Sequence, residues 1–162
     1  MTPGANTATA SDREIVVART IDAPRALVFS AYTDEKHLAA WWGPNGFTTT
    51  THRFSFRVGG IWDFIMHGPD GTDYPNYIEY REIVPPERIV LLHGDRAGDP
   101  KAFVSTIEFV ERDGATEITL RALFKTKAMR DDVVERFGAI EGGKQTLCRL
   151  AVYVATLTSE HN

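Results

Sequence analysis

The chain has 162 residues, of which 43% are hydrophobic and 25% charged, so it is long enough for one domain whose core needs no disulfide or metal. Its formal net charge of −4 argues against nucleic-acid binding, and no segment approaches the ~20 apolar residues of a membrane-spanning helix. The single cysteine, Cys148, excludes an intrachain disulfide and suits a reducing compartment, so we expect a cytoplasmic protein without nucleic-acid or membrane partners. We expect Cys148 itself to be buried like a small hydrophobic residue.

The N-terminal part of the chain predicts a tail, one strand and two short helices. Residues 1–12 are small and polar and lack the apolar segment of a secretory signal, so we expect a disordered tail. A partly alternating apolar segment over 14–21 predicts the first strand. Residues 22–32 show helical spacing after a proline, and residues 33–42 predict a second short helix that ends at a tryptophan pair.

The middle of the chain predicts consecutive strands, and the end predicts helices. β-branched or alternating segments predict strands over 48–56, 61–67, 72–84, 88–93, 102–111 and 115–124. Turn sequences such as Gly68-Pro69-Asp70-Gly71 join these segments and predict antiparallel pairing. Met129, Val133 and Phe137 then recur at helical spacing up to Gly138. From residue 139 on, the apolar spacing predicts a long amphipathic helix.

This order of elements predicts an α+β fold in one domain that spans residues 13–159. We expect a curved antiparallel sheet of about six or seven strands, with two short helices after the first strand. An antiparallel sheet with one apolar face needs a cover, and the long C-terminal helix is the obvious one. The sheet would then wrap around this helix, and any unfilled space would lie between the two.

Four segments of the chain resemble one known family. They are Ile21-Asp22-Ala23-Pro24, Trp41-Trp42-Gly43-Pro44, Gly59-Gly60-Ile61-Trp62-Asp63-Phe64 and Glu82-Ile83-Val84-Pro85-Pro86-Glu87-Arg88-Ile89. Together they resemble the START-like (SRPBCC, helix-grip) superfamily, and within it the activator of heat-shock-protein-90 ATPase homologue family, over residues 14–157. The resemblance implies a helix-grip fold with a cavity that many members use for hydrophobic or aromatic ligands. It does not imply one chemistry, because the relatives include lipid carriers, cyclases or aromatases and co-chaperones.

The chain departs from the family pattern at Gly142-Gly143, where family members often carry a bulky aromatic residue. Each glycine weakens a helix by about 1 kcal/mol relative to alanine and leaves volume that a ring would occupy. We hypothesise that the missing ring widens the cavity near Trp41 or Trp42. Two alternatives remain, in which a neighbouring side chain fills the gap or the helix starts later.

The candidate ligand-binding residues come from strand phase, from the tryptophan pair and from one face of the last helix. They are Trp41, Trp42, Phe47, Trp62, Phe64, Met66, Tyr77, Ile107, Phe109, Gly142, Gln145, Thr146 and Arg149. Most are apolar, and Gln145 and Thr146 would be the polar groups that orient a ligand.

The chain carries no recognisable catalytic or metal-binding motif. The five histidines show no metal-ligand spacing, so we expect no metal and no cofactor. G-x-S-x-G and phosphate-binding glycine motifs are also missing from the sequence. A carboxylate within a strand would be a candidate general acid or base if it pointed inward. Strand phase leaves open whether Glu79 or Glu82 faces the cavity.

The sequence therefore predicts a protein that binds a hydrophobic or aromatic small molecule between the sheet and the last helix. One alternative is a cyclase-, aromatase- or hydrolase-like enzyme that uses the same cavity. Another is a co-chaperone-like module that binds a chaperone, although such relatives carry an additional N-terminal domain where this chain has a short tail. An inward carboxylate or histidine would favour the enzyme, and a dry apolar wall would favour binding.

Overall fold

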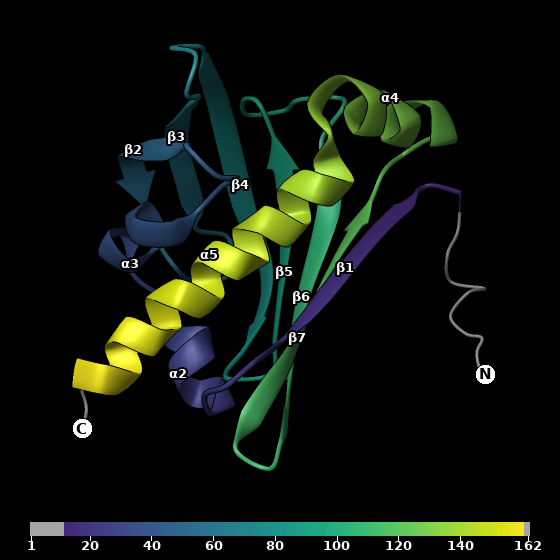
Figure 1. Ribbon diagram of the computed structural model, residues 1–162. Coiled ribbons are helices and arrows are strands. Elements are labelled where there is room, and N and C mark those ends of the chain that lie inside the picture. The colour runs from purple at the N-terminus through teal and green to yellow at the C-terminus, as the bar shows by residue number, and fades with distance from the viewer. Residues whose placement is uncertain (1–11, 161–162) are drawn as a thin grey trace.

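The computed structural model describes residues 12–160 and contains a seven-stranded sheet and four helices in that range (Figure 1). The elements are β1 (Glu14–Ile21), α2 (Arg25–Ser30), α3 (Glu35–Trp41), β2 (Thr48–Phe54), β3 (Ile61–His67), β4 (Asp73–Val84), β5 (Arg88–Gly94), β6 (Phe103–Arg112), β7 (Ala115–Leu123), α4 (Lys127–Phe137) and α5 (Ala139–Glu160). The predicted tail lies outside the described residues except for Asp12. No helix within 12–160 is long and apolar enough to cross a membrane.

The sheet is antiparallel throughout and has the strand order β1-β7-β6-β5-β4-β3-β2. Strands β2 to β7 are neighbours in sequence order because short turns join them, which antiparallel pairing permits. The sheet curves, and α5 crosses its concave face diagonally (Figure 1). This arrangement confirms the predicted α+β helix-grip fold, with the two short helices after the first strand.

Local capping defines where the helices begin and end. The Asp34 side chain accepts a hydrogen bond from the Lys36 backbone N–H at 2.8 Å and so caps α3. Thr126 caps α4 in the same way, with Met129 N–H as donor at 3.1 Å. Gly138 ends α4 in the left-handed conformation (φ 59°), which glycine adopts at little cost, and α5 begins at the next residue. A single glycine therefore joins α4 to α5 and sets the angle between them.

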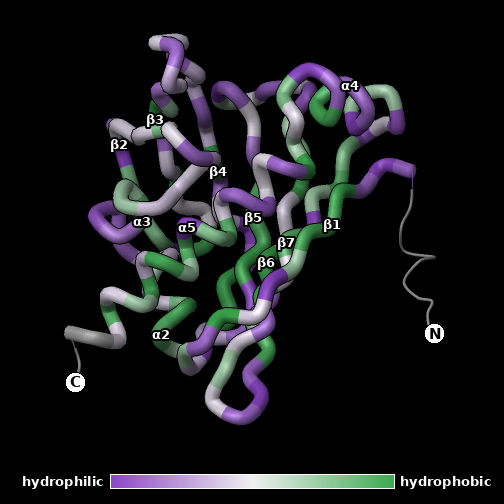
Figure 2. The backbone as a smooth tube through the Cα atoms, viewed as in Figure 1, coloured by the Kyte–Doolittle hydropathy of each residue, from purple (hydrophilic) through white to green (hydrophobic). Residues whose placement is uncertain are grey.

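The core lies between the concave face of the sheet and α5. Leu147, Leu150 and Val154 point from α5 toward the sheet, and each is at most 1% exposed. Figure 2 shows hydrophobic segments along the strands beneath α5 and a hydrophilic turn between β6 and β7. The expectation that Cys148 is buried is wrong, because this residue lies on the opposite face of α5 and is exposed.

One end of this core is filled by aromatic rings from the short helices. Tyr32, after α2, packs edge-to-face on Trp41 of α3 at 4.8 Å between ring centroids, and on Phe109 of β6 at 5.5 Å. Burial raises the pKa of the Tyr32 hydroxyl far above its ordinary range. The Trp41 indole N–H donates to the Ala31 carbonyl at 3.1 Å, so the polar atom of this buried ring is satisfied.

Candidate functional site

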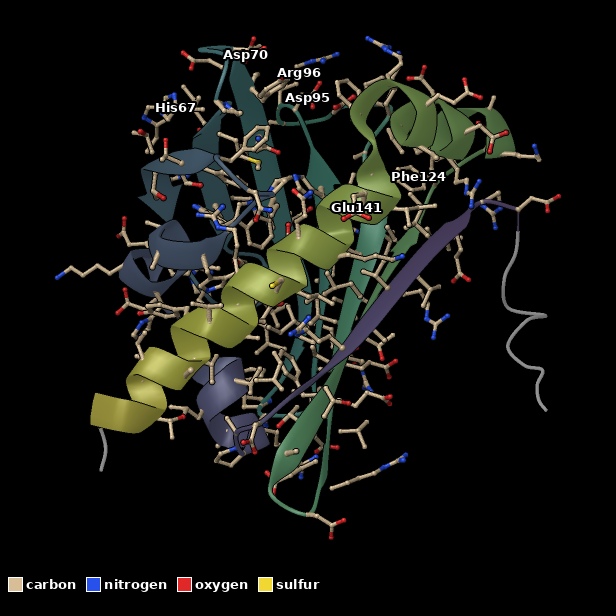
Figure 3. All side chains as sticks on the ribbon, in the orientation of Figure 1. His67, Asp70, Asp95, Arg96, Phe124 and Glu141 are labelled. Atoms are coloured by element: carbon tan, nitrogen blue, oxygen red, sulfur yellow. The ribbon has the colours of Figure 1, made fainter. Side chains whose placement is uncertain are left out.

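A cavity of about 1300 Å³ lies at the other end of the core, between α4, the first turns of α5 and the ends of the central strands. Figure 3 labels Asp95, Phe124 and Glu141, which border this cavity from the β5–β6 loop, the end of β7 and α5. Ligand-binding cavities typically measure about 300–1,000 Å³. The volume is thus large enough for a small organic molecule together with water.

The glycine pair of α5 borders this cavity. Gly142 and Gly143 both line it, and they lie inside α5, which begins three residues earlier at Ala139. A Cβ atom on Gly143 would lie 3.2 Å from Cγ2 of Val17, so this glycine allows α5 to approach β1 closely. A Cβ atom on Gly142 would lie 3.4 Å from Cγ of Pro44, and the tryptophan pair does not line the cavity.

One face of α4 forms the outer wall of the cavity. The residues of α4 that line it recur at helical spacing and are Ala128, Met129, Asp132, Val133, Arg136 and Phe137. None of the α4 side chains is buried, and Phe137 is 58% exposed. The helical spacing of Met129, Val133 and Phe137 is visible in the sequence. In the structure these side chains border the cavity instead of a filled core.

A hydrogen-bonded pair of polar side chains, His93 and Asn76, lines the cavity among aromatic rings. His93 of β5 lies next to Asn76 of β4, with 2.7 Å between its Nε2 and the Asn76 Oδ1. The His93 ring lies 5.0 Å from the Phe103 ring centroid and 6.3 Å from that of Phe64. Burial lowers the pKa of the His93 imidazole to about 4, so this histidine is neutral at pH 7.

The rim of the cavity carries charges of both signs. Asp99 accepts hydrogen bonds from the backbone N–H groups of Asp95 at 2.8 Å and Lys101 at 2.9 Å, which lower the pKa of its carboxyl group. Arg136 pairs with Asp132 on α4 at 3.2 Å. The polar character of the cavity is therefore concentrated at its mouth and at the His93–Asn76 pair.

Two residues of α5 hold the loop that carries Phe47. Arg149 Nη1 donates to three successive backbone carbonyls, at 3.2 Å from Trp42 and 2.9 Å from both Gly43 and Pro44. Gln145, one helical turn earlier, accepts from the Asn45 backbone N–H at 3.1 Å. Burial lowers the pKa of the Arg149 guanidinium, which faces these carbonyls. Arg149 and Gln145 thus position the loop over the cavity, and Gln145 also lines it.

The structure distributes the thirteen predicted site residues over several environments. The cavity is lined by Phe47, Met66, Gly142 and Gln145. The core, at no more than 2% exposure, holds Trp41, Trp62, Phe64, Ile107 and Phe109. Trp42 is half-buried and packs edge-to-face on Trp62 at 4.8 Å between ring centroids. The Thr146 hydroxyl donates to the Gly142 carbonyl within α5 at 2.9 Å.

The remaining predicted residue, Tyr77, lies on the outer face of the sheet. Its hydroxyl accepts a hydrogen bond from Arg53 at 3.2 Å. Glu79 and Glu82 also point outward and pair with Arg81 at 3.2 Å and Arg88 at 2.9 Å. Glu79 lies out of phase with the inward Asn76 and Ile78. Glu82 shares their phase in the sequence, but the register shift between Tyr80 and Glu82 turns it outward, so neither carboxylate faces the cavity.

Sequence reasoning missed the polar pair, although a signal for it exists. Asn76 shares its strand phase with Ile78 and Tyr80, both of which are at most 3% exposed. His93 lies in phase with Leu91, whose exposure is 3%. An inward asparagine and an inward histidine on two strands that a turn joins would have suggested a buried polar pair. Their direct contact depends on the register of β4 and β5, which the sequence does not give.

Asp73, His67 and Thr50 form a chain of hydrogen bonds in which a carboxylate, a histidine and a hydroxyl follow each other, as in a catalytic triad. The chain lies at the outer edge of the sheet. The Asp73 Oδ1 lies 2.7 Å from His67 Nδ1, and His67 Nε2 lies 2.8 Å from the Thr50 hydroxyl. Asp73 and Thr50 are exposed, and the group lies outside the cavity described above. The geometry fits a cross-strand polar network that stabilises the edge. Within the same range, no group of three or more His, Cys, Asp or Glu residues is arranged to hold a metal ion.

Comparison with solved structures shows the same fold in bacterial proteins. A crystal structure of a protein from Nitrosomonas europaea is 22% identical, with a TM-score of 0.82 and coverage of 92% of this chain and 98% of that one. A solution structure from Arthrobacter aurescens is also 22% identical, with a TM-score of 0.82 and coverage of 90% and 87%. A crystal structure from Chromobacterium violaceum is 26% identical, with a TM-score of 0.77 and coverage of 89% and 98%.

Comparison with protein families gives a match over most of the sequence. The model of the family described as "Activator of Hsp90 ATPase homolog 1-like protein" matches residues 22–155. None of the curated proteins compared with the chain matches it. The matched range contains the two short helices, strands β2 to β7 and all but the end of α5. The chain therefore belongs to the Activator of Hsp90 ATPase homolog 1-like family, within the START-like superfamily.

Proposed function

We propose that the protein binds a hydrophobic or aromatic small molecule in the cavity between the sheet and the N-terminal part of α5. The observation that carries this proposal is the size of the cavity combined with its inner wall. The apolar and aromatic side chains of that wall are Phe47, Met66, Tyr74, Phe103 and Phe124. Transfer of an apolar ligand from water to such a wall is favourable by roughly 25 cal/mol per Å² of apolar surface buried.

The arrangement of the rings favours an aromatic ligand. Phe103 and Phe124 lie 4.7 Å apart between ring centroids at an interplanar angle of 33°, and His93 continues this row at 5.0 Å from Phe103. Aromatic pairs stabilise each other in offset or edge-to-face arrangements at centroid separations of about 4.5–7 Å. A planar ligand can therefore extend this row of rings into the cavity.

A thermal-shift screen with neutral aromatic compounds tests the proposal. We expect at least one compound to raise the melting temperature, since a ligand at 100 times its Kd stabilises the folded state by about 2.7 kcal/mol. Val133→Trp places an indole in the cavity from α4 and should reduce the shift. Val152→Trp, at an exposed position of α5 that does not line the cavity, should preserve it. A screen without any shift, or a shift that Val133→Trp leaves unchanged, would contradict binding in this cavity.

An enzyme that uses the same cavity is the second candidate, and His93 is the observation that favours it. The imidazole faces the cavity, has a hydrogen-bond partner and has a perturbed pKa, as active-site histidines often do. A pKa of about 4 makes this imidazole a weak base at neutral pH, however. Binding is therefore better supported than a cyclase- or hydrolase-like reaction.

A chaperone partner is less well supported than a small molecule. The large hydrophobic side chains that are exposed lie on four separate elements and in the β2–β3 connection, and they are Val16, Val58, Val110, Phe137 and Val152. Of these, Phe137 borders the cavity. A surface that binds another protein usually gathers its apolar side chains into one patch.

We propose that ligand binding occurs in the cytoplasm, which the single cysteine supports.

A further inference from the structure

The His93–Asn76 pair has a defined orientation within the cavity. The Asn76 amide nitrogen donates to the backbone carbonyl of Tyr74 at 2.9 Å, and its Oδ1 lies 2.7 Å from His93 Nε2. If the Asn76 amide were flipped, its oxygen would face the Tyr74 carbonyl oxygen, and two acceptors would repel each other. The Tyr74 carbonyl therefore fixes which end of the Asn76 amide faces the histidine.

This orientation determines which nitrogen of His93 carries the proton. The Asn76 Oδ1 is an acceptor only, so His93 Nε2 must donate. Because burial keeps the imidazole neutral at pH 7, the second nitrogen, Nδ1, is unprotonated and carries a lone pair. The pair thus presents a hydrogen-bond acceptor at Nδ1 and no charge.

The Nδ1 lone pair is available to a ligand. Among the residues that the structure describes, Nδ1 has no hydrogen-bond partner, and it is not one of the fully buried polar atoms that lack one. Its ring lines the cavity, with Phe103 and Phe64 beside it and the indole of Trp42 at 6.4 Å between ring centroids. A group bound at Nδ1 would therefore lie among aromatic rings, where an unmatched polar group is costly.

We propose that the cavity selects a neutral aromatic ligand with a hydroxyl group, a phenol or an enol, whose O–H donates to His93 Nδ1. This inference rests on the proposed function and names its ligand class. A carboxylate ligand would bring acceptor oxygens against the acceptor Nδ1 and would lose its hydration among the rings. An ether or an unsubstituted ring would leave Nδ1 without a donor, which also lowers affinity.

The test compares four ligands that share one ring system: naphthol, methoxynaphthalene, naphthalene and naphthoate. We expect naphthol to bind the wild-type protein roughly fivefold more tightly than naphthalene or methoxynaphthalene, the effect of one hydrogen bond, and naphthoate to bind most weakly. His93→Phe keeps an aromatic ring but removes the acceptor, so the preference for naphthol should disappear. His67→Phe, a histidine outside the cavity, should leave the preference unchanged.

A spectroscopic measurement on the wild-type protein makes the test independent of whether His93→Phe folds. Nitrogen NMR of the histidine side chains should show a protonated Nε2 and an unprotonated Nδ1 on His93, and naphthol should shift the Nδ1 signal. Equal affinities for all four compounds, or a preference for naphthoate, would overturn the inference and leave the proposed function intact. If none of the four compounds bound, both the proposed function and the inference would fall.

Discussion

The two ends of the space between α5 and the sheet differ in how they are filled. At the end near α2 and α3, Tyr32, Trp41 and Phe109 pack into a core in which each is at most 4% exposed. At the end near α4, the same two layers border an open cavity of about 1300 Å³. The same sheet and the same helix form both ends, so the difference arises from the side chains that each end supplies.

The two short helices close their end because they insert rings between the layers. Helix α4 does not do this at the other end, since none of its side chains is buried and it borders the cavity from outside. Helix α5 contributes Gly142 and Gly143 there, which have no side chains to fill the space. A helix-grip fold can therefore combine a solid core with an open cavity without a change of topology.

The difference in packing between the two ends is tested most directly by removing one ring from each end. Phe109→Ala should lower the free energy of unfolding by about 3–5 kcal/mol, because it leaves a cavity in a packed core. Phe137→Ala removes a ring that is 58% exposed and should change the free energy of unfolding by no more than about 0.5 kcal/mol. Urea unfolding of both variants measures the difference. Similar losses would mean that the α4 end is packed as tightly as the other.

A pH series tests the environment of His93 at the open end. In the folded protein burial lowers the pKa of this imidazole from 6.5 to about 4, so below pH 6.5 the unfolded chain binds the proton more strongly. The free energy of unfolding should therefore fall as the pH decreases from 6.5 toward 4, by at most about 3 kcal/mol from this group.

The matched control for the pH series is His93→Gln, which removes the titrating group. Denaturant unfolding near neutral pH and again at pH 4 should show a smaller loss of stability in His93→Gln than in the wild type. Parallel losses in the two proteins would indicate that water in the cavity solvates the imidazole as fully as bulk solvent does.

The smallest expected effect comes from the glycine pair of α5. Gly142→Ala places a Cβ 3.4 Å from Cγ of Pro44, an ordinary contact, and should stabilise the protein by up to about 1 kcal/mol through helix propensity. Gly143→Ala places a Cβ 3.2 Å from Val17, which must move, so this variant should be the less stable of the two. Thermal unfolding ranks the variants, and the reverse order would show that α5 and β1 are not in close contact at Gly143.

Much of the fold could be predicted because its signals are local. The alternation along β3 places Trp62 and Phe64 on one face, and both are buried on the concave side as phase requires. Gly138 interrupts the helical spacing of apolar residues in the sequence, and in the structure it separates α4 from α5. The phase of β4 was harder to assign, because an inward asparagine and outward Tyr77 invert the usual distribution of polar and aromatic residues.

The candidate site was predicted only in part, because an inward residue is not the same as a cavity-lining residue. Ile107 and Phe109 point inward and are buried, and the rings of Phe29 and Tyr32 pack on Phe109. Met66, two residues beyond Phe64 on the same strand face, borders the cavity because it lies past the reach of those rings. Position along the strand, measured against the helix above it, decides between core and cavity, and that position is a tertiary property.

The element order, the antiparallel sheet, the long final helix and the family can be read from the amino-acid sequence, because periodicity, turns and motifs are encoded within short segments. Which end of the core stays open, and the contact of His93 with Asn76 across β4 and β5, become visible only in the folded structure. These features depend on how side chains far apart in sequence share one volume, and on a register that shifts between Tyr80 and Glu82.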